Sequence, residues 1–512
     1  MTTIVRTALL WVLVLAAGYA RADVTLAPLF TDGAVLQRDR SLPIWGKAKP
    51  GEKVTVSFGS QRREATTAAD GRWLVLLDPV PVSATGSDMI VSGENTVLVR
   101  DVLVGDVWLC SGQSNMVMQV SRADNAAQEI AAARYPLIRH VKITQTVAET
   151  PADAVATSGW QTATADNVAT FTAVGYFFAR DIRLKTGVPI GLINSSWGGT
   201  PVEAWMSPAA LASDPAFRVV DERWTQTVAE FPAQKLAFDA QLAGWTRAED
   251  AAKARGKAPH DAFLAKNPRP RPPRGPGDPW TPRGLFNGMI NPLLPYAIRG
   301  TLWYQGESNA SRASEYRALF SAMITAWRSH FGQGDLPFYW VNLANFAVAG
   351  DANGISYALL REAQTQTLEL PNTGQALAID IGNPKDIHPT NKQEVGRRLA
   401  LLARNRVYDI VGDDTGPSFA SAAREGAAWR VRFTHASSGL IARDKPVQSL
   451  QLAGADRVFH PASGRIDRDT LIVTAPAVRE PIAVRYAWSN APEANLYNGA
   501  GLPAVPFRTD AW

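Results

Sequence analysis

The sequence predicts an α/β protein whose doubly wound parallel sheet is flanked along the chain by two β units. Residues 23–99 and 412–512 contain short alternating apolar runs separated by turn signals, which is typical of small β domains. Between them, over residues 100–411, buried-type strands alternate with amphipathic helical stretches. A helical segment rich in proline and arginine over residues 219–283 interrupts this alternation, and we interpret it as an insertion.

Residues 1–22 have the pattern of a signal peptide. Arg6 supplies a positive start, residues 8–17 a short apolar core, and Ala20-Arg21-Ala22 an A-x-A cleavage signal. An uncleaved anchor is the alternative, but the cleavage signal follows at the expected distance and the apolar core is too short to span a bilayer. We therefore expect a mature chain beginning near Asp23, exported to the periplasm or secreted, with no membrane anchor.

The composition of the 512 residues excludes several classes of protein. It is 46% hydrophobic and 19% charged, as in ordinary globular proteins of this length. The net charge of +5 comes from scattered basic residues, so we expect no nucleic-acid partner. Cys110 is the only cysteine and is predicted to be a buried core residue, not a nucleophile. The histidines show no paired ligand spacing, which disfavours a metal site.

The first β unit contains three clear strand patterns, at residues 41–45, 53–57 and 71–76. Trp45 and Trp73 lie in these runs and are predicted to be core residues rather than sugar-binding platforms. The last strand of the unit is expected to lead directly into the apolar run that begins at Asp106.

Strands and helices alternate after that point. The expected strands are residues 106–112, 188–193, 300–304, 336–343 and 375–381, and the expected helices are residues 174–186, 316–331, 357–370 and 392–404. Residues 219–258 are predicted to form an amphipathic helical region, and residues 267–274 an extended Pro/Arg tract. This segment fits either a lid at the substrate rim or a solvated basic loop. Strands are expected again at residues 429–433, 449–452, 471–474 and 483–486.

Polar residues follow four of the predicted strands in turn. Because ligands bind outside the carboxyl ends of parallel strands, these loops should meet at one edge of the sheet. Ser114 lies on the first loop, and Asp386 and His388 lie on the last. A serine hydroxyl needs a base within hydrogen-bond reach, and a carboxylate can orient that base. A serine in a turn is usually a cap and a lone histidine is often structural, but their joint occurrence on one face favours catalysis.

The loops between them could supply an oxyanion site. Attack on an ester creates a negative oxygen that requires fixed hydrogen-bond donors. Candidate donors are the backbone N–H of Ser114, the N–H of Gly198 or Gly199, and the side-chain amide of Gln305 or Asn309. No G-x-S-x-G motif surrounds Ser114, which argues against the common α/β-hydrolase lipases and esterases.

Three motifs give the sequence a family resemblance. Gly112-Gln-Ser-Asn-Met116, Trp303-Tyr-Gln-Gly-Glu307 and Asp386-Ile-His-Pro389 resemble the motifs of SGNH-type carbohydrate esterases, most closely the sialate O-acetylesterase-like group. Further matching segments at residues 35–38 and 501–508 extend the resemblance over nearly the whole mature chain. It implies a flavodoxin-like sheet, with Ser114 as nucleophile, His388 as general base and Asp386 as its orienting acid. It also implies removal of acetyl groups from sugars without metal or cofactor.

Two departures from the superfamily pattern leave assignments open. The superfamily has an Asp three residues before the histidine, where this chain has Lys385, so Asp386, Asp380 or a dyad without an acid could serve. The third motif lacks the usual Asn two residues after the glycine. Gln305 is therefore the preferred oxyanion donor and Asn309 the second. Gln113, Asn115 and Glu307 are predicted to support the catalytic groups without contacting the substrate.

These observations predict an exported serine esterase that removes O-acetyl groups from a carbohydrate through an acetyl-serine intermediate. The sugar could be sialic acid or a plant cell-wall glycan such as xylan or xyloglucan. The alternative is a non-catalytic glycan-binding protein, and a peptidase or thioesterase with the same triad is disfavoured by the motifs. The sequence makes no prediction of oligomeric state.

Overall fold

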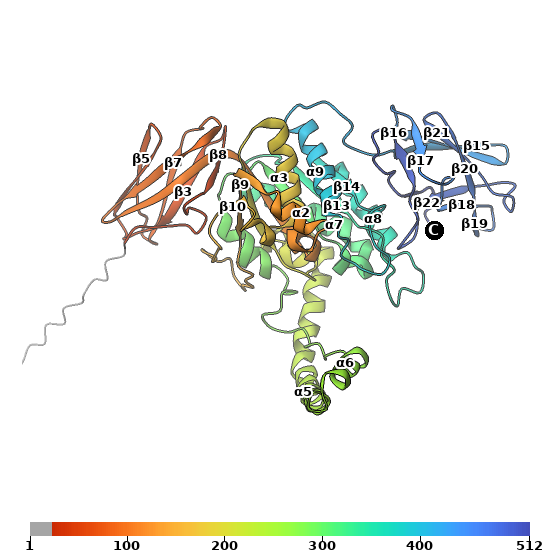
Figure 1. Ribbon diagram of the computed structural model, residues 1–512, viewed down its shortest axis with the longest axis horizontal. Helices are drawn as coiled ribbons and strands as arrows, with labels where there is room; N and C mark the ends of the chain where they lie inside the picture. Colours follow the sequence, from red (N-terminus) through yellow and green to blue (C-terminus); the bar gives the residue numbers. More distant parts are fainter. Residues whose placement is uncertain (1–22) are drawn as a thin grey trace, which may run out of the picture.

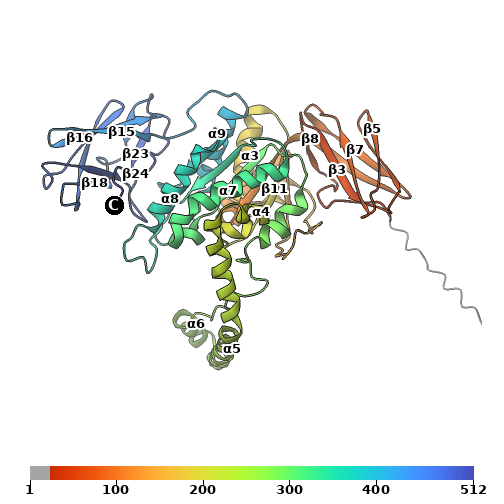
Figure 2. The same cartoon turned by 180° about the vertical axis from the view of Figure 1, so that it is seen from behind.

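A computed structural model describes residues 23–512, so the predicted signal peptide at residues 1–22 lies outside the described residues. The chain forms three parts in a row: a β part containing β3 to β7, a central α/β part, and a second β part that ends at the C-terminus (Figure 1). A helical arm extends from the central part (Figures 1 and 2). This order agrees with the predicted succession of β, α/β and β segments.

The first β part forms two small layers. Its strands are β1 (Thr25–Leu26), β2 (Val35–Gln37), β3 (Leu42–Lys47), β4 (Lys53–Phe58), β5 (Gln61–Thr66), β6 (Arg72–Leu77) and β7 (Ser83–Ser92). β1, β3 and β6 form one sheet, while β4, β5 and β7 join a sheet that continues through β8. Trp73 is buried, and the half-buried Trp45 packs edge-on against Phe30 at 4.9 Å between ring centroids. Both tryptophans are therefore core residues, as predicted.

A single long strand, β8 (Thr96–Gly112), joins this part to the central sheet. Its first residues pair antiparallel with β7, and its later residues lie between β11 and β12. Residues 102–112 are buried without interruption, which agrees with their nearly continuous apolar sequence. The predicted domain limit between residues 99 and 100 falls inside this strand.

The central sheet has the strand order β10-β9-β11-β8-β12-β13-β14. Neighbouring strands in this order are parallel, except that β10 is antiparallel to β9. The strands are β9 (Arg134–Lys142), β10 (Gln161–Thr164), β11 (Ile190–Ser196), β12 (Gly300–Tyr304), β13 (Phe338–Asn342) and β14 (Thr373–Leu377). The predicted strands are confirmed with limits shifted by a few residues. β9 was not predicted, because basic residues and a proline interrupt its apolar pattern. β10 was not predicted either, because it is short and mostly polar.

Helices cover both faces of this sheet. Neighbouring residues of β12 belong to different cores: Leu302 packs with α3 (Ala173–Thr186) and α9 (Lys392–Arg406), and Trp303 with α7 (Ala313–Phe331). Figure 1 shows α3 and α9 on the near face, and Figure 2 shows α7 and α8 (Ser356–Gln366) on the opposite face. The shorter helices are α1 (Ser114–Val117), α2 (Ala126–Ala131) and α4 (Pro208–Ala212). The predicted double winding is thus observed.

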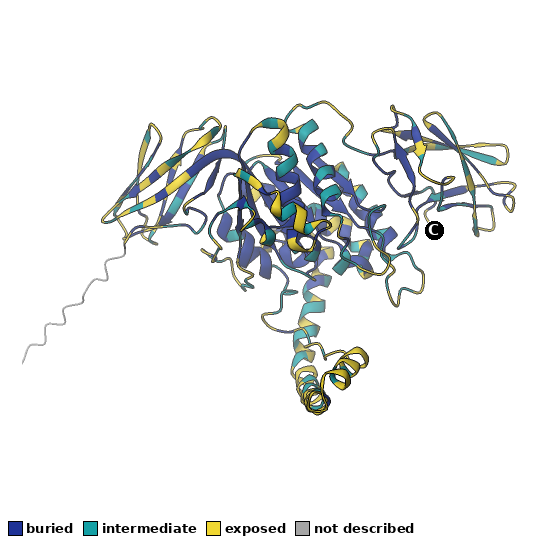
Figure 3. Cartoon of the chain, in the orientation of Figure 1, coloured by how far each residue is buried: buried dark blue, intermediate teal, exposed yellow. Residues whose placement is uncertain are grey.

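We call one projecting segment the arm. It consists of α5 (Arg218–Ala254), α6 (Lys257–Lys266) and the Pro/Arg tract that follows. It projects from the body and is largely exposed (Figure 3). The predicted helical region is present, but the apolar residues of α5 lie largely on its surface: Leu236 is 74% exposed. Polar pairs one turn apart, such as Lys235 with Asp239, line α5 instead.

The second β part comprises ten short strands. They are β15 (Ser418–Glu425), β16 (Ala428–Thr434), β17 (Leu440–Ala442), β18 (Leu450–Ala453), β19 (Phe459–Pro461), β20 (Ser463–Asp467), β21 (Thr470–Thr474), β22 (Ala483–Tyr486), β23 (Leu496–Asn498) and β24 (Phe507–Arg508). The buried Arg361 of α8 anchors this part, because its guanidinium donates to the carbonyls of Ser489 at 2.8 Å and Asn490 at 2.7 Å. Within residues 23–512, no helix has the length and apolar character needed to cross a membrane.

Candidate active site

Ser114 and His388 form a hydrogen-bonded pair at the carboxyl end of the central sheet. Ser114 is the first residue of α1, directly after the turn that ends β8, and His388 Nε2 lies 2.8 Å from its Oγ. Gly112 makes this turn with φ of +126°, and a Cβ there would come within 2.3 Å of the Tyr304 carbonyl oxygen. Only glycine fits that position. The structure thus brings together two predicted residues that are 274 positions apart.

Asp386 is the acid that lies beside the imidazole. Its Oδ1 is 3.5 Å from His388 Nδ1 and accepts a hydrogen bond of 2.9 Å from the His388 backbone N–H. The distance between Asp386 Oδ1 and His388 Nδ1 is longer than an ordinary hydrogen bond, and the Asp386 side chain is 57% exposed. The contact is therefore a charge interaction across a local turn.

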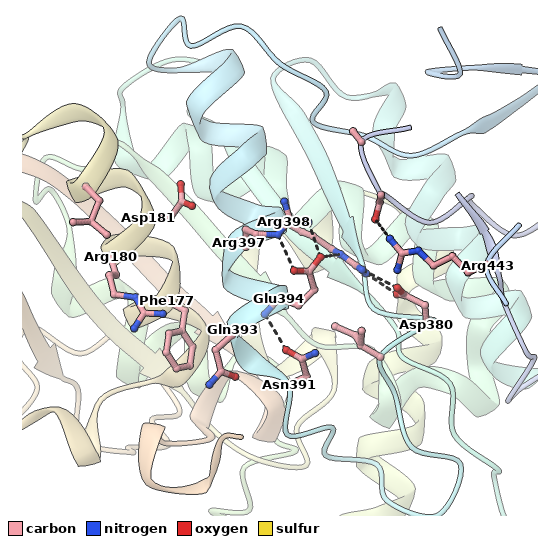
Figure 4. Close-up of a pocket in the computed structure, with 14 residues that line it drawn as sticks. Phe177, Arg180, Asp181, Asp380, Asn391, Gln393, Glu394, Arg397, Arg398 and Arg443 are labelled. Carbon is pink, nitrogen blue, oxygen red and sulfur yellow. Dashed lines mark hydrogen bonds and ion pairs between the residues drawn. The ribbon is translucent and has the colours of Figure 1, made fainter. Parts of the chain in front are cut away.

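Asp380, the alternative acid, forms an ion pair with Arg398 and not with His388. Its carboxylate accepts two hydrogen bonds from Arg398, of 2.6 and 2.8 Å, and a third from the Tyr497 hydroxyl at 3.2 Å. Figure 4 shows the Asp380–Arg398 pair in a cavity of about 720 Å³ that the second β part closes on one side. Neither Ser114 nor His388 lines this cavity. Asp380 therefore neutralises Arg398 and does not orient His388.

Burial lowers the pKa of His388 below its ordinary value of 6.5. The Asp386 carboxylate acts in the opposite direction, while the positive charges of Lys392 and Arg122 add to the lowering. His388 is consequently neutral near pH 7, which is the form that can accept a proton from the serine hydroxyl.

A buried network behind Ser114 holds the histidine loop. Asn115 donates from Nδ2 to Glu307 Oε1 at 2.6 Å and to the carbonyl of Ile387 at 3.0 Å. Its Oδ1 accepts from Lys392 Nζ at 2.6 Å. Burial lowers the pKa of Lys392 to about 7 and raises that of Glu307. Asn115 and Glu307 occur next to the pair as predicted, whereas Lys392 was missed because a lysine at a helix start resembles a surface residue.

Gln113 and the loop at residues 305–309 lie on the other side of Ser114. The Gln113 side-chain oxygen accepts from the backbone N–H groups of Gly306 at 3.3 Å and Ser308 at 3.4 Å. Gln113 therefore ties the turn before the serine to the loop after β12.

The amides of Gln305 and Asn309 have other partners than the expected oxyanion. Gln305 Nε2 donates to the Thr200 carbonyl at 3.1 Å and to Asn309 Oδ1 at 2.7 Å, and its oxygen accepts from the Tyr316 hydroxyl at 2.9 Å. Asn309 Nδ2 donates to Glu203 at 2.8 Å. Both side chains are buried in this network. The arrangement differs from the expected one because the Gln305 amide is used within this buried network, including a bond to Thr200, which is 105 positions away.

Gly198 lies against the serine. A Cβ built on Gly198 would be 3.3 Å from the Ser114 Cβ, and Gly199 has φ of +73°. Within residues 23–512, the backbone N–H groups of Gly198 and Gly199 have no hydrogen-bond acceptor. The Ser114 N–H opens a helix and so has no intrahelical acceptor. These N–H groups are free to bind an oxyanion.

The described residues contain no group of three or more His, Cys, Asp or Glu side chains arranged to hold a metal ion. Cys110 is fully buried in β8, and burial raises the pKa of its thiol, which confirms the prediction of an unreactive core residue.

Comparison with known proteins places the chain in a family. The chain matches the family described as "Carbohydrate esterase, sialic acid-specific acetylesterase" over residues 104–236 and 280–404. It is 32% identical over 412 residues to the sialate O-acetylesterase of Rattus norvegicus, covering 73% of this chain and 72% of that enzyme. The Mus musculus sialate O-acetylesterase is 30% identical over 530 residues, covering 92% of each chain.

A solved structure covers nearly the whole protein as well. The crystal structure of a carbohydrate acetylesterase from Xanthomonas citri is 40% identical, with a TM-score of 0.80 over 96% of this chain and all of that one. The α/β fold, the strand-end site and these relatives define a carbohydrate esterase. The chain belongs to the family of sialic acid-specific acetylesterases and is a carbohydrate O-acetylesterase, which confirms the resemblance of its motifs.

Proposed function

We propose that this protein is an exported serine esterase that removes O-acetyl groups from carbohydrates through an acetyl-serine intermediate. The observation that carries the proposal is the 2.8 Å contact between Ser114 Oγ and His388 Nε2. The signal pattern of residues 1–22 supports export. Free N–H groups on Ser114 and Gly198 would supply the oxyanion site, in place of the Gln305 amide.

The proposed reaction has two halves. In the first, Ser114 Oγ attacks the acetyl carbonyl while His388 Nε2 takes the hydroxyl proton, and the Asp386 carboxylate stabilises the resulting imidazolium. The tetrahedral intermediate collapses when the imidazolium returns the proton to the leaving sugar oxygen. In the second half, His388 takes a proton from water, the hydroxide attacks the acetyl-serine, and acetate leaves as Ser114 regains its proton.

The proposed fold is the flavodoxin-like fold of SGNH hydrolases. Five neighbouring strands, β11-β8-β12-β13-β14, have the order 2-1-3-4-5 when numbered along the chain, which is the flavodoxin-like order. The gap between residues 236 and 280 in the family match supports the proposal that the arm is an insertion. We retain residues 23–99, 100–411 and 412–512 as the proposed domains.

The experiment is to measure acetate release from an aryl acetate, an O-acetylated sialic acid and acetylated xylo-oligosaccharides. Release from at least one acetylated sugar is expected, and an organophosphonate should label Ser114, as located by mass spectrometry. Absence of release, or labelling of another residue, would contradict the proposed mechanism and favour a glycan-binding protein. The two sugars distinguish a sialic acid from a plant cell-wall glycan as substrate.

The pH dependence of kcat/KM should follow His388. Because burial holds its folded pKa below 6.5 and the neutral form is the active base, kcat/KM is expected to rise with pH, with an inflection below 6.5, and then to level off. Arg122→Gln removes a positive charge that favours the neutral ring, so its inflection should lie at higher pH. An inflection above 6.5 in the wild-type enzyme would contradict the assignment.

Gln305→Ala should mainly lower stability. The substitution removes three buried hydrogen bonds of the Gln305 amide and leaves the Thr200 carbonyl without its partner, so the free energy of unfolding should fall by about 2–4 kcal/mol. Urea denaturation measures the change, with Ser308→Ala as a neighbouring control. Unchanged stability together with a loss of kcat of about 10²–10³ would instead restore Gln305 as an oxyanion donor.

A further inference from the structure

Trp280 lies where the arm rejoins the α/β part, next to the loop that contains Gly198 and Gly199. Its indole Nε1 donates a 2.7 Å hydrogen bond to the carbonyl of Gly199. Gly198, the preceding residue, is the one that packs against Ser114. A half-exposed aromatic side chain thus lies one loop residue away from the glycine that borders the nucleophile.

Two guanidinium groups approach this indole. The Arg274 Cζ lies 3.2 Å from the ring centroid of Trp280, and the Arg312 Cζ lies 5.7 Å from it. Arg312 forms an ion pair of 2.7 Å with Glu203, yet its Nε is buried and has no hydrogen-bond acceptor among the described residues. Within residues 23–512, Arg274 has no carboxylate at ion-pair distance. Positive charge is therefore incompletely balanced beside the active-site loop.

Arg274 is exposed to solvent, so a ligand can reach its guanidinium. Partial burial and the charge of Arg312 lower the pKa of Arg274, while Asp278 and Glu203 act in the opposite direction. Like charges held near each other repel, and an anion bound between them would relieve that repulsion. The arrangement favours a negatively charged ligand group.

The arm supplies Arg274 and holds it in place. The family match omits residues 237–279 and resumes at residue 280, so Trp280 and Arg312 lie in the matched region and Arg274 does not. The next residue, Gly275, lies so close to the Phe231 ring of α5 that a Cβ there would approach it within 2.2 Å. This close packing fixes the tract on α5 and keeps Arg274 over Trp280.

We propose that Arg274 is a specificity-determining residue that binds a carboxylate on the acetylated glycan, with Trp280 and Arg312 forming the rest of the contact surface. A planar guanidinium can donate two parallel hydrogen bonds to a carboxylate, and stacking on the Trp280 indole orients that of Arg274. The inference rests on the proposed function, because it assumes that Ser114 marks the ester position. The carboxylate could belong to a sialic acid or to a uronic acid side group of a plant glycan.

The test compares anionic and neutral substrates in Arg274→Gln. The substrates are an O-acetylated sialic acid, an acetylated xylo-oligosaccharide bearing a uronic acid, and the same oligosaccharide without it. The ratio of kcat/KM for the preferred anionic substrate to that for the neutral one should fall about tenfold, through KM, because one charge-assisted contact is lost. Arg269→Gln is the matched control, since Arg269 lies in the same tract over Trp245, at 5.9 Å. It should leave the ratio unchanged.

Salt and equilibrium binding provide readouts that a structural role would not alter. The wild-type KM for the anionic substrate should rise with NaCl, and this dependence should weaken in Arg274→Gln. In Ser114→Ala protein, which would not turn over the ligand, adding Arg274→Gln should weaken binding of the anionic sugar and not of the neutral one. An unchanged ratio, or equal loss for all three substrates, would overturn the inference. Absence of hydrolysis with selective anion binding intact would instead refute only the proposed catalysis.

Discussion

Ser114→Ala is expected to reduce kcat for an acetyl ester by about 10⁴-fold or more while the protein remains folded. Among residues 23–512, the hydroxyl has one hydrogen-bond partner, His388 Nε2, so its loss removes the proposed nucleophile and leaves no other described group unpaired. The oxyanion N–H groups of the loop stay in place. Residual activity should therefore reflect binding and oxyanion stabilisation alone.

Ser308→Ala provides the control for this variant, because Ser308 lies in a neighbouring loop and its backbone N–H, not its hydroxyl, contacts the Gln113 side chain. Initial rates with an aryl acetate and circular dichroism of both variants complete the measurement. Turnover by Ser114→Ala within tenfold of the wild-type rate would remove Ser114 from the mechanism.

Asp386→Asn is expected to lower kcat by up to about 10⁴-fold with little change in stability. The carboxylate is the negative group beside His388 Nδ1, at 3.5 Å, and an asparagine there would offer neither the charge nor the preference for the productive tautomer. Since the side chain is 57% exposed, its replacement should have little effect on the free energy of unfolding.

Asp380→Asn should show the opposite behaviour. Asp380 is paired with the buried Arg398, so its replacement should lower the unfolding midpoint while leaving kcat per folded molecule near the wild-type value. Thermal denaturation and kcat of the two variants separate the roles. A near-wild-type Asp386→Asn enzyme together with an inactive but folded Asp380→Asn enzyme would reverse our assignment of the acid.

The expected and observed structures differ most where partners are distant in sequence. The loops that carry Ser114 and His388 were predictable, because polar residues that follow an apolar strand are a local signal. β9 was not predictable in this way, since its sequence mixes basic residues with apolar ones. α5 was expected to be amphipathic, but its apolar residues are scattered over a largely exposed helix in which Val220 and Ala252 are the buried residues.

By itself, the sequence determined the class of fold, the order of its parts, the family and the serine–histidine pair. Each of these depends on short patterns whose meaning is local, such as strand ends, turns and motif spacing. The tertiary structure decided which carboxylate lies beside His388, because Asp380 is paired with Arg398. It also turned Gln305 toward Thr200 and brought Arg274 to Trp280 beside the active-site loop. The Gln305–Thr200 contact joins residues 105 positions apart. The contacts of Asp380 with Arg398 and of Arg274 with Trp280 depend on how loops and helices fold back in three dimensions, which no local sequence pattern encodes.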